Sequence, residues 1–228
     1  MLFDLRSSGR RRTIKLIYLT LAFLMGGGLI LFGIGGGTSL NGGLFDAFSG
    51  NSGGGSVDDR FKKQETALVA KVRANPQDAA AYAQLARVRF QLAGSGDQYD
   101  PNTNQYTNEG KAELRQAASA WQQHLKLAGE KPDPRVATSM VNAYIALGDV
   151  KDAVAAQEIV AEDRNAAGQY STLAILAYQA GQTRKGDLAK DKAIELTPKD
   201  QRETVKGQLE QAKQQALGAT GGASGSGG

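Results

Sequence analysis

The chain contains no cysteine and only one histidine among its 228 residues. Disulfides, thiol nucleophiles and thiolate metal sites are therefore excluded. The single histidine, His124, lies in the helix-forming stretch "ASAWQQHLKLA", and one histidine without cysteine argues against a zinc site or a Ser-His-Asp triad. We predict that the protein is not an enzyme, that it has no catalytic residue, cofactor or metal, and that His124 lies on a helix surface.

Phosphate-binding motifs are also missing, although glycine is abundant. The glycine-rich stretch over residues 24–43 contains no G-x-G-x-x-G fingerprint, and no lysine follows its glycines as a Walker loop requires. Net positive charge is confined to the N-terminus, because residues 1–15 carry +4 and so does the whole chain. The rest of the chain is balanced, so its charge does not indicate a nucleic-acid partner.

One long apolar run follows this basic start. Residues 14–34 contain Lys15 as their only charge, and as a helix they would be about 31 Å long, which matches the hydrocarbon core of a bilayer. No Lys or Arg follows until Arg60, so the positive-inside rule predicts that residues 1–13 are cytoplasmic and the remainder extracytoplasmic. We predict an uncleaved, single-pass signal anchor in the cell membrane; the alternatives are a cleaved signal peptide and a buried core helix.

Small residues within and just after this run are spaced as in helices that pack inside membranes. Ala22 with Gly26, and Gly33 with Gly37, have small-xxx-small spacing, so another membrane helix is a candidate partner alongside the lipid.

A flexible linker is expected after the apolar run. Residues 35–57 have a Gly/Ser composition, as do residues 218–228 at the C-terminus. The linker is interrupted by "LFDAF", where Leu44, Phe45 and Phe48 form either a sticky turn or a docking motif.

Residues 58–217 have a helical composition with breaks at regular intervals, which predicts an all-α domain. The blocks 134–167 and 167–200 each read as a helix, a Gly-polar turn, a second helix and a stop. Alignment of Gly148 with Gly181 superposes "AYIALGDVKDA" on "LAYQAGQTRKG" with a period of 33 residues. Such a period is typical of antiparallel helical hairpins stacked as a solenoid.

The two blocks resemble the tetratricopeptide repeat, a 34-residue helical hairpin. The phrase "AIELTPKD" is very similar to the end of the family's repeat, whereas Ala137 replaces an expected aromatic residue. The matching residues are Tyr144, Gly148, Asp149 and Ala153 in the first block, and Tyr170, Leu173, Ala174, Gly181, Ala193 and Pro198 in the second.

A degenerate unit precedes these two blocks. Its first helix follows "NPQD" and its second starts near Gly110, with Trp121 expected in the core; the insertion 94–109 separates them. The insertion is rich in Asp and Asn, but Gln105 and Lys111 occupy the Gly and Glu positions of an EF-hand, so we predict a surface loop or hairpin held by Tyr99 and Tyr106. An irregular calcium loop is the alternative. Residues 58–74 and 199–217 are expected to cap a stack of about three repeats.

The resemblance implies that proteins or peptides bind in a concave groove lined by the first helix of each repeat. The layout is similar to membrane-anchored bacterial repeat proteins that accompany the secretion translocon and its envelope chaperones, which implies a scaffold or accessory in the cell envelope. The alternatives are a structural or assembly subunit of an envelope complex and a binder of small cell-wall ligands. The groove residues implied are Arg87, Phe90 and Gln91, then Thr138, Asn142 and Ile145, then Ser171, Tyr178 and Gln179.

Overall fold

The computed structural model describes residues 57–222, with side chains over 58–218. Within 57–222 no helix combines the length and apolarity that a membrane crossing needs. The described part is all-helical apart from one small hairpin, which confirms the predicted all-α class.

Several predictions from the sequence lie outside the described residues and remain predictions. They concern the cytoplasmic segment, the membrane anchor, most of the linker and the last six residues. The same holds for the small residues predicted to pack against another membrane helix, Ala22, Gly26, Gly33 and Gly37, and for the docking motif Leu44, Phe45 and Phe48.

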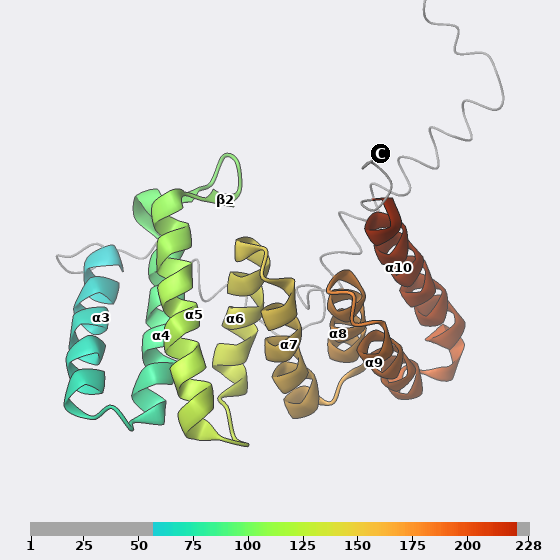
Figure 1. Ribbon diagram of the computed structural model, residues 1–228, viewed down its shortest axis with the longest axis horizontal. Helices are drawn as coiled ribbons and strands as arrows, with labels where there is room; N and C mark the ends of the chain where they lie inside the picture. The colour runs from blue at the N-terminus through green and yellow to red at the C-terminus, as the bar shows by residue number, and fades with distance from the viewer. Residues whose placement is uncertain (1–56, 223–228) are drawn as a thin grey trace, which may run out of the picture. The chain divides into compact units, whose positions relative to one another are not determined.

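Eight α-helices make up the described part of the chain (Figure 1). Short breaks at proline, glycine or asparagine separate most of them, as the sequence predicted. The end of α10 differs from the prediction. This helix continues beyond Gly218, where we expected the tail to begin. A single glycine destabilises a helix by only about 1 kcal/mol and does not by itself end it. The helices are α3 (Val57–Ala74), α4 (Ala79–Ala93), α5 (Asn108–Ala128), α6 (Pro134–Leu147), α7 (Val150–Arg164), α8 (Ala167–Gln179), α9 (Thr183–Leu196) and α10 (Arg202–Gly222).

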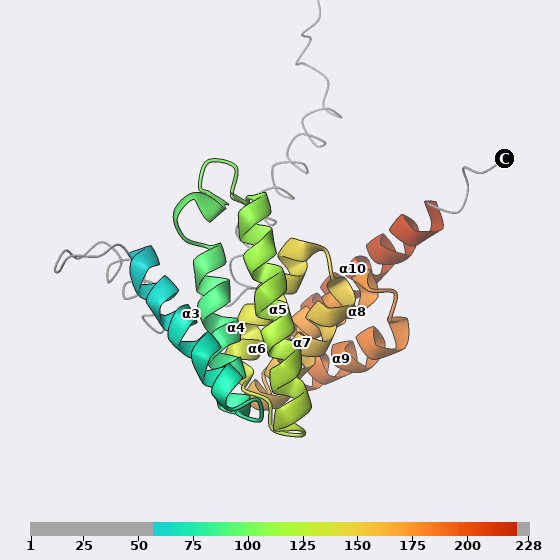
Figure 2. The same cartoon turned by 60° about the vertical axis from the view of Figure 1, so that its left-hand side comes forward.

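The helices pack mainly against their neighbours in the sequence. The pairs α4/α5, α6/α7 and α8/α9 have the most extensive contacts, α5 then packs on α6, and α7 on α8. α3 lies against α4, and α10 lies against α8 and α9 (Figures 1 and 2). Each helix pair is therefore covered by the next element along the chain.

Alanine dominates the contacts between these helices. Trp121, Leu114, Met140 and Leu209 are the largest of the fully buried side chains, and the core position of Trp121 confirms its prediction. Most other buried positions carry small side chains, which let helix backbones approach closely. Fully buried alanines include Ala81, Ala86, Ala93, Ala117, Ala137, Ala143, Ala153, Ala161, Ala174, Ala177 and Ala193.

Two glycines end the first helix of their pairs in the same way. Gly148 and Gly181 have φ of 80° and 71°, a left-handed conformation that favours glycine. At Gly148 the next residue, Asp149, donates its N–H to the Tyr144 carbonyl at 2.9 Å, and at Gly181 Gln182 donates to Ala177 at 2.8 Å. These are Schellman hydrogen bonds, so the two turns that the 33-residue alignment superposed share one geometry.

The insertion, predicted as a surface loop or hairpin, forms a hairpin between the end of α4 and the start of α5. A 3₁₀ turn (Gly96–Gln98) leads into β1 (Tyr99–Asp100), which pairs antiparallel with β2 (Gln105–Tyr106). The rings of Tyr99 and Tyr106 meet edge to face with centroids 5.2 Å apart. A β-carbon at Gly110 would lie 2.1 Å from the Gln98 carbonyl oxygen, so only glycine allows the hairpin to rest directly on α5.

Replacement of Gly148 by alanine is expected to lower the free energy of unfolding by about 1–2 kcal/mol, because an L residue pays that cost in the left-handed region. No atom lies within 4 Å of an added β-carbon there, so backbone conformation alone sets the loss. Gly207→Ala, inside α10 and equally uncrowded, is the matched control and should raise stability by about 0.5–1 kcal/mol. Urea unfolding followed by circular dichroism measures both, and a neutral Gly148→Ala would contradict the turn geometry.

Candidate functional site

A hollow runs along α4 where this helix faces α3 on one side and α6 on the other. One part, of about 380 Å³, lies between α3 and α4, and the other, of about 540 Å³, lies between α4, the end of α5 and the start of α6. Gln84 and Arg87 line both parts, and we call the two parts together the α4 hollow. Its further lining residues include Gln64, Leu68, His124, Lys131 and Arg135.

Cations outnumber anions around the α4 hollow. Asp133 pairs with Arg135 at 3.3 Å, and Asp78 pairs with Lys71 at 3.1 Å. Both carboxylates also cap helices: Asp78 accepts the N–H of Ala81, and this hydrogen bond, with Lys71, lowers the pKa of Asp78. Within residues 57–222 Arg87 and Lys131 have no acidic partner, so the hollow presents two unpaired positive charges.

His124 forms part of the wall of the hollow, and the prediction that it lies on a helix surface is wrong. It is 4% exposed and stacks on Trp121 with ring centroids 5.0 Å apart. Its Nδ1 is 2.8 Å from the Ala79 carbonyl oxygen, and its Nε2 accepts the Asp133 N–H at 3.0 Å. These partners define a neutral imidazole that donates at Nδ1 and accepts at Nε2, and that ties α5 to the starts of α4 and α6.

The sequence contained a signal for this position that we did not use. His124 follows Leu114, Ala117 and Trp121 at helical spacing, and all four side chains are buried on one face of α5. A polar residue in register with a buried stripe indicates a hydrogen-bonded core position.

The structure brings only part of the predicted groove together. Arg87 lines the α4 hollow. Asn142, Ile145 and Gln179 are exposed on α6 and α8, and Phe90, Gln91 and Thr138 are half-buried. None of these six is among the residues that line a described hollow.

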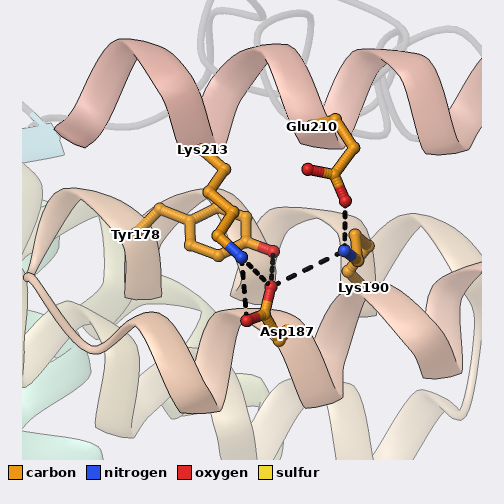
Figure 3. A network of polar contacts seen from close by, with 5 residues as sticks. All are labelled: Tyr178, Asp187, Lys190, Glu210 and Lys213. Atoms are coloured by element: carbon orange, nitrogen blue, oxygen red, sulfur yellow. Dashed lines mark hydrogen bonds and ion pairs between the residues drawn. The ribbon is translucent and has the colours of Figure 1, made fainter. Parts of the chain in front are cut away.

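Ser171 and Tyr178 are buried, so their predicted place on an open groove is wrong. The Tyr178 hydroxyl donates a hydrogen bond to Asp187 at 2.9 Å (Figure 3). The Tyr178 ring packs closely on Gly186, because a β-carbon added to this glycine would lie only 2.4 Å from the ring. Burial and the neighbouring carboxylate raise the pKa of Tyr178, while Lys213 and then the tyrosine hydroxyl lower the pKa of Asp187. Helix α10 contributes Lys213 to this cluster and thereby covers the tyrosine (Figure 3).

A second hollow, of about 700 Å³, lies between α7, α8 and α9 and was not predicted. Tyr170 and Leu173 line it from α8, and Leu188 of α9, 64% exposed, stands at its rim. Glu158 and Lys185, two of its four charged lining residues, form an ion pair of 2.6 Å.

The insertion hairpin carries acidic residues but shows no metal site. Asp100 accepts the N–H of Asn102 and the hydroxyl of Thr103, and these hydrogen bonds lower its pKa. Among residues 57–222 no three acidic or histidine side chains are grouped closely enough to hold a metal ion.

A charged cluster joins α3, α4 and α5. Arg89 donates from Nε to Glu65 at 2.9 Å and from Nη1 to the Gln116 carbonyl at 3.4 Å. Glu113 stands near this pair, and its Oε2 is buried without a hydrogen-bond partner in the described part of the chain. Burial, and then repulsion from Glu65, raise the pKa of Glu113.

The chain matches no model of a known protein family, and no curated protein is significantly similar to it.

Replacement of His124 by phenylalanine is expected to lower the free energy of unfolding by about 1–3 kcal/mol. Phenylalanine keeps the stacking on Trp121, but it removes both hydrogen bonds of the imidazole and leaves the part-buried Asp133 N–H without its partner. The exposed neighbour Gln123→Ala is the control and should change stability by less than about 0.5 kcal/mol. Equal unfolding midpoints for the two variants would show that the histidine bonds do not hold these helices together.

Replacement of Glu113 by glutamine is expected to stabilise the fold at pH 8. The raised pKa means that the folded state disfavours the charged carboxylate, so the wild type loses stability as the pH rises through that pKa. The advantage of the variant should therefore shrink as the pH is lowered from 8 to 4. Urea unfolding at several pH values measures this, and a difference that does not vary with pH would be evidence against the assignment.

Proposed function

We propose that residues 57–222 form a short tetratricopeptide-like stack. Three helix pairs in sequence order, the shared geometry at Gly148 and Gly181, and their 33-residue spacing support this assignment. α3 and α10 flank the three pairs, as capping helices at the ends of a repeat stack would. In such a stack each helix pair buries its apolar face against the neighbouring pairs. The stack therefore forms an extended, ordered surface on which a ligand can bind.

The function that this surface supports best is binding of a polypeptide segment along the α4 hollow. The observation that carries the proposal is that Arg87 and Lys131, which lack acidic partners among the described residues, both line the part of the α4 hollow between α4, α5 and α6. Asp78 and Asp133 are already engaged by helix N–H groups and by cations, so they do not neutralise the hollow. An extended peptide with a carboxylate beside Arg87 would satisfy these charges with charge-assisted hydrogen bonds.

The N-terminal sequence supports a location for this activity. Residues 14–34 are long and apolar enough to anchor the chain, and the basic residues before them favour a cytoplasmic N-terminus. The domain would then stand outside the membrane on the 35–57 linker, where Leu44, Phe45 and Phe48 offer a further contact. We therefore propose a membrane-anchored scaffold or accessory that receives polypeptides at the outer face of a bacterial cell membrane.

Photo-crosslinking from the α4 hollow tests the proposal. A photoreactive amino acid at Gln84 in the full chain, in spheroplasts, is expected to form polypeptide adducts, and Arg87→Ala should lower their yield about tenfold, as loss of a charge-assisted hydrogen bond does. Arg115→Ala, an exposed arginine on α5 outside the hollow, is the matched control and should leave the yield unchanged. Protease added outside the spheroplasts should digest the adducts.

Two outcomes would contradict the proposal. Adducts that form equally in the Arg87→Ala variant would show that the hollow does not select its ligand by charge. Adducts that resist external protease would place the domain on the cytoplasmic side.

A further inference from the structure

Helix α10 lies on α8 and α9 along a single stripe of side chains. Val205, Leu209, Ala212, Lys213 and Ala216 follow one another at helical spacing, and each of them is buried or half-buried. Leu209 is 2% exposed and joins the core, whereas the other four are only partly buried. One leucine thus supplies the apolar centre of this contact.

Charges of opposite sign match across the same contact (Figure 3). Lys213 of α10 places its Nζ 2.8 and 2.9 Å from the two carboxylate oxygens of Asp187, and 5.8 Å from the centre of the Tyr178 ring. Glu210 of α10 accepts a hydrogen bond from Lys190, which also lies 3.6 Å from Asp187. The α8/α9 surface therefore presents Asp187, Lys190 and Tyr178. Helix α10 places Lys213 against Asp187 and the Tyr178 ring, and Glu210 against Lys190.

Two hydrogen bonds to backbone carbonyls attach the first turn of α10 to the end of α9. Arg202 donates from Nε to the Thr197 carbonyl and from Nη2 to the Glu195 carbonyl, both at 2.9 Å, which fixes the start of the helix to the end of α9. Beyond Leu209 the contact includes partly exposed ion pairs and the half-buried Ala212 and Ala216. Segments with few buried apolar contacts open locally at lower free energy than the core, so the body of α10 can leave while its start stays attached.

We propose that this surface of α8 and α9, the α10 seat, is a helix-docking site that the chain's own α10 occupies. Its partner is an amphipathic helix with the same pattern as "LEQAK", an aliphatic residue followed by an acidic residue and, three positions later, by lysine. Such a helix replaces α10, places its aliphatic side chain in the pocket of Leu209, and pairs with Asp187 and Lys190. The bound α10 is thus an internal competitor that any partner must displace.

The α10 seat is separate from the α4 hollow. α8, α9 and α10 build the seat, whereas α3, α4, α5 and α6 line the hollow, so the inference does not rest on peptide binding at Arg87. The seat also accounts for the buried state of Tyr178, because Lys213 of the competitor lies over its ring.

A labelled peptide with the sequence of residues 202–218 tests the seat in the full chain. Leu209→Asp should weaken the internal competitor, and this variant should bind the peptide at least tenfold more tightly than the wild type in fluorescence anisotropy. Gln211→Asp, which adds the same charge on the exposed side of α10, is the matched control and should bind no more tightly than wild type. A peptide with Leu209→Asp should bind none of the three chains.

The proposal is overturned if the folded Leu209→Asp chain binds neither peptide, or binds both equally. If that variant does not fold, a charge exchange decides instead. Asp187→Lys and Lys213→Asp alone should each raise hydrogen exchange of the α10 amides at least tenfold, and the double variant should restore protection. Unchanged exchange in the single variants, or no restoration in the double, would show that this charge pattern does not select the helix in the seat.

Discussion

The close approach of helices through alanine is the constraint on which this domain depends. Each helix from α4 to α9 carries at least one fully buried alanine, such as Ala81 in α4, Ala117 in α5 and Ala153 in α7. Small side chains let the helix backbones come close together, but each one buries little apolar area. Because burial stabilises the fold by about 25 cal/mol per Å² of apolar area, each alanine contributes little free energy. The few bulky core residues and the directional polar contacts therefore determine how each helix is aligned with the next.

Buried hydrogen bonds supply that alignment at successive junctions. His124 links α5 to the starts of α4 and α6, and Gln157 of α7 donates to the backbone carbonyl of Gln169 in α8 at 3.0 Å. Tyr178 then links α8 to α9 through Asp187. A helix displaced along its neighbour would separate these partners and leave a buried polar group unsatisfied. The apolar surfaces allow sliding, and the polar groups oppose it.

Local chemistry made much of the architecture predictable from the sequence. Glycine and proline marked the helix ends, the spacing of Gly148 and Gly181 identified two turns with one geometry, and the tyrosines of the insertion indicated its hairpin. The candidate site was less predictable, because periodicity identifies the face of a helix but not the element that covers it. Tyr178 has the spacing of a groove residue, yet α10 lies over it, and of the predicted set Arg87 alone lines one of the three hollows described above. The positive charge of the hollow depends on which acids are already paired, and only three-dimensional contacts reveal this.

The fit of the insertion against Gly110 has a consequence for engineering the molecule. Because the hairpin rests on bare backbone at its base, and Thr107 caps α5 directly after β2, the direction of the hairpin is fixed by the helix beneath it. Its tip, Pro101 to Asn104, is exposed. An epitope or a fluorophore grafted there would follow the orientation of the first helix pair without touching the α4 hollow or the α10 seat. The loop is therefore a suitable site for a label with which to image the protein in the cell.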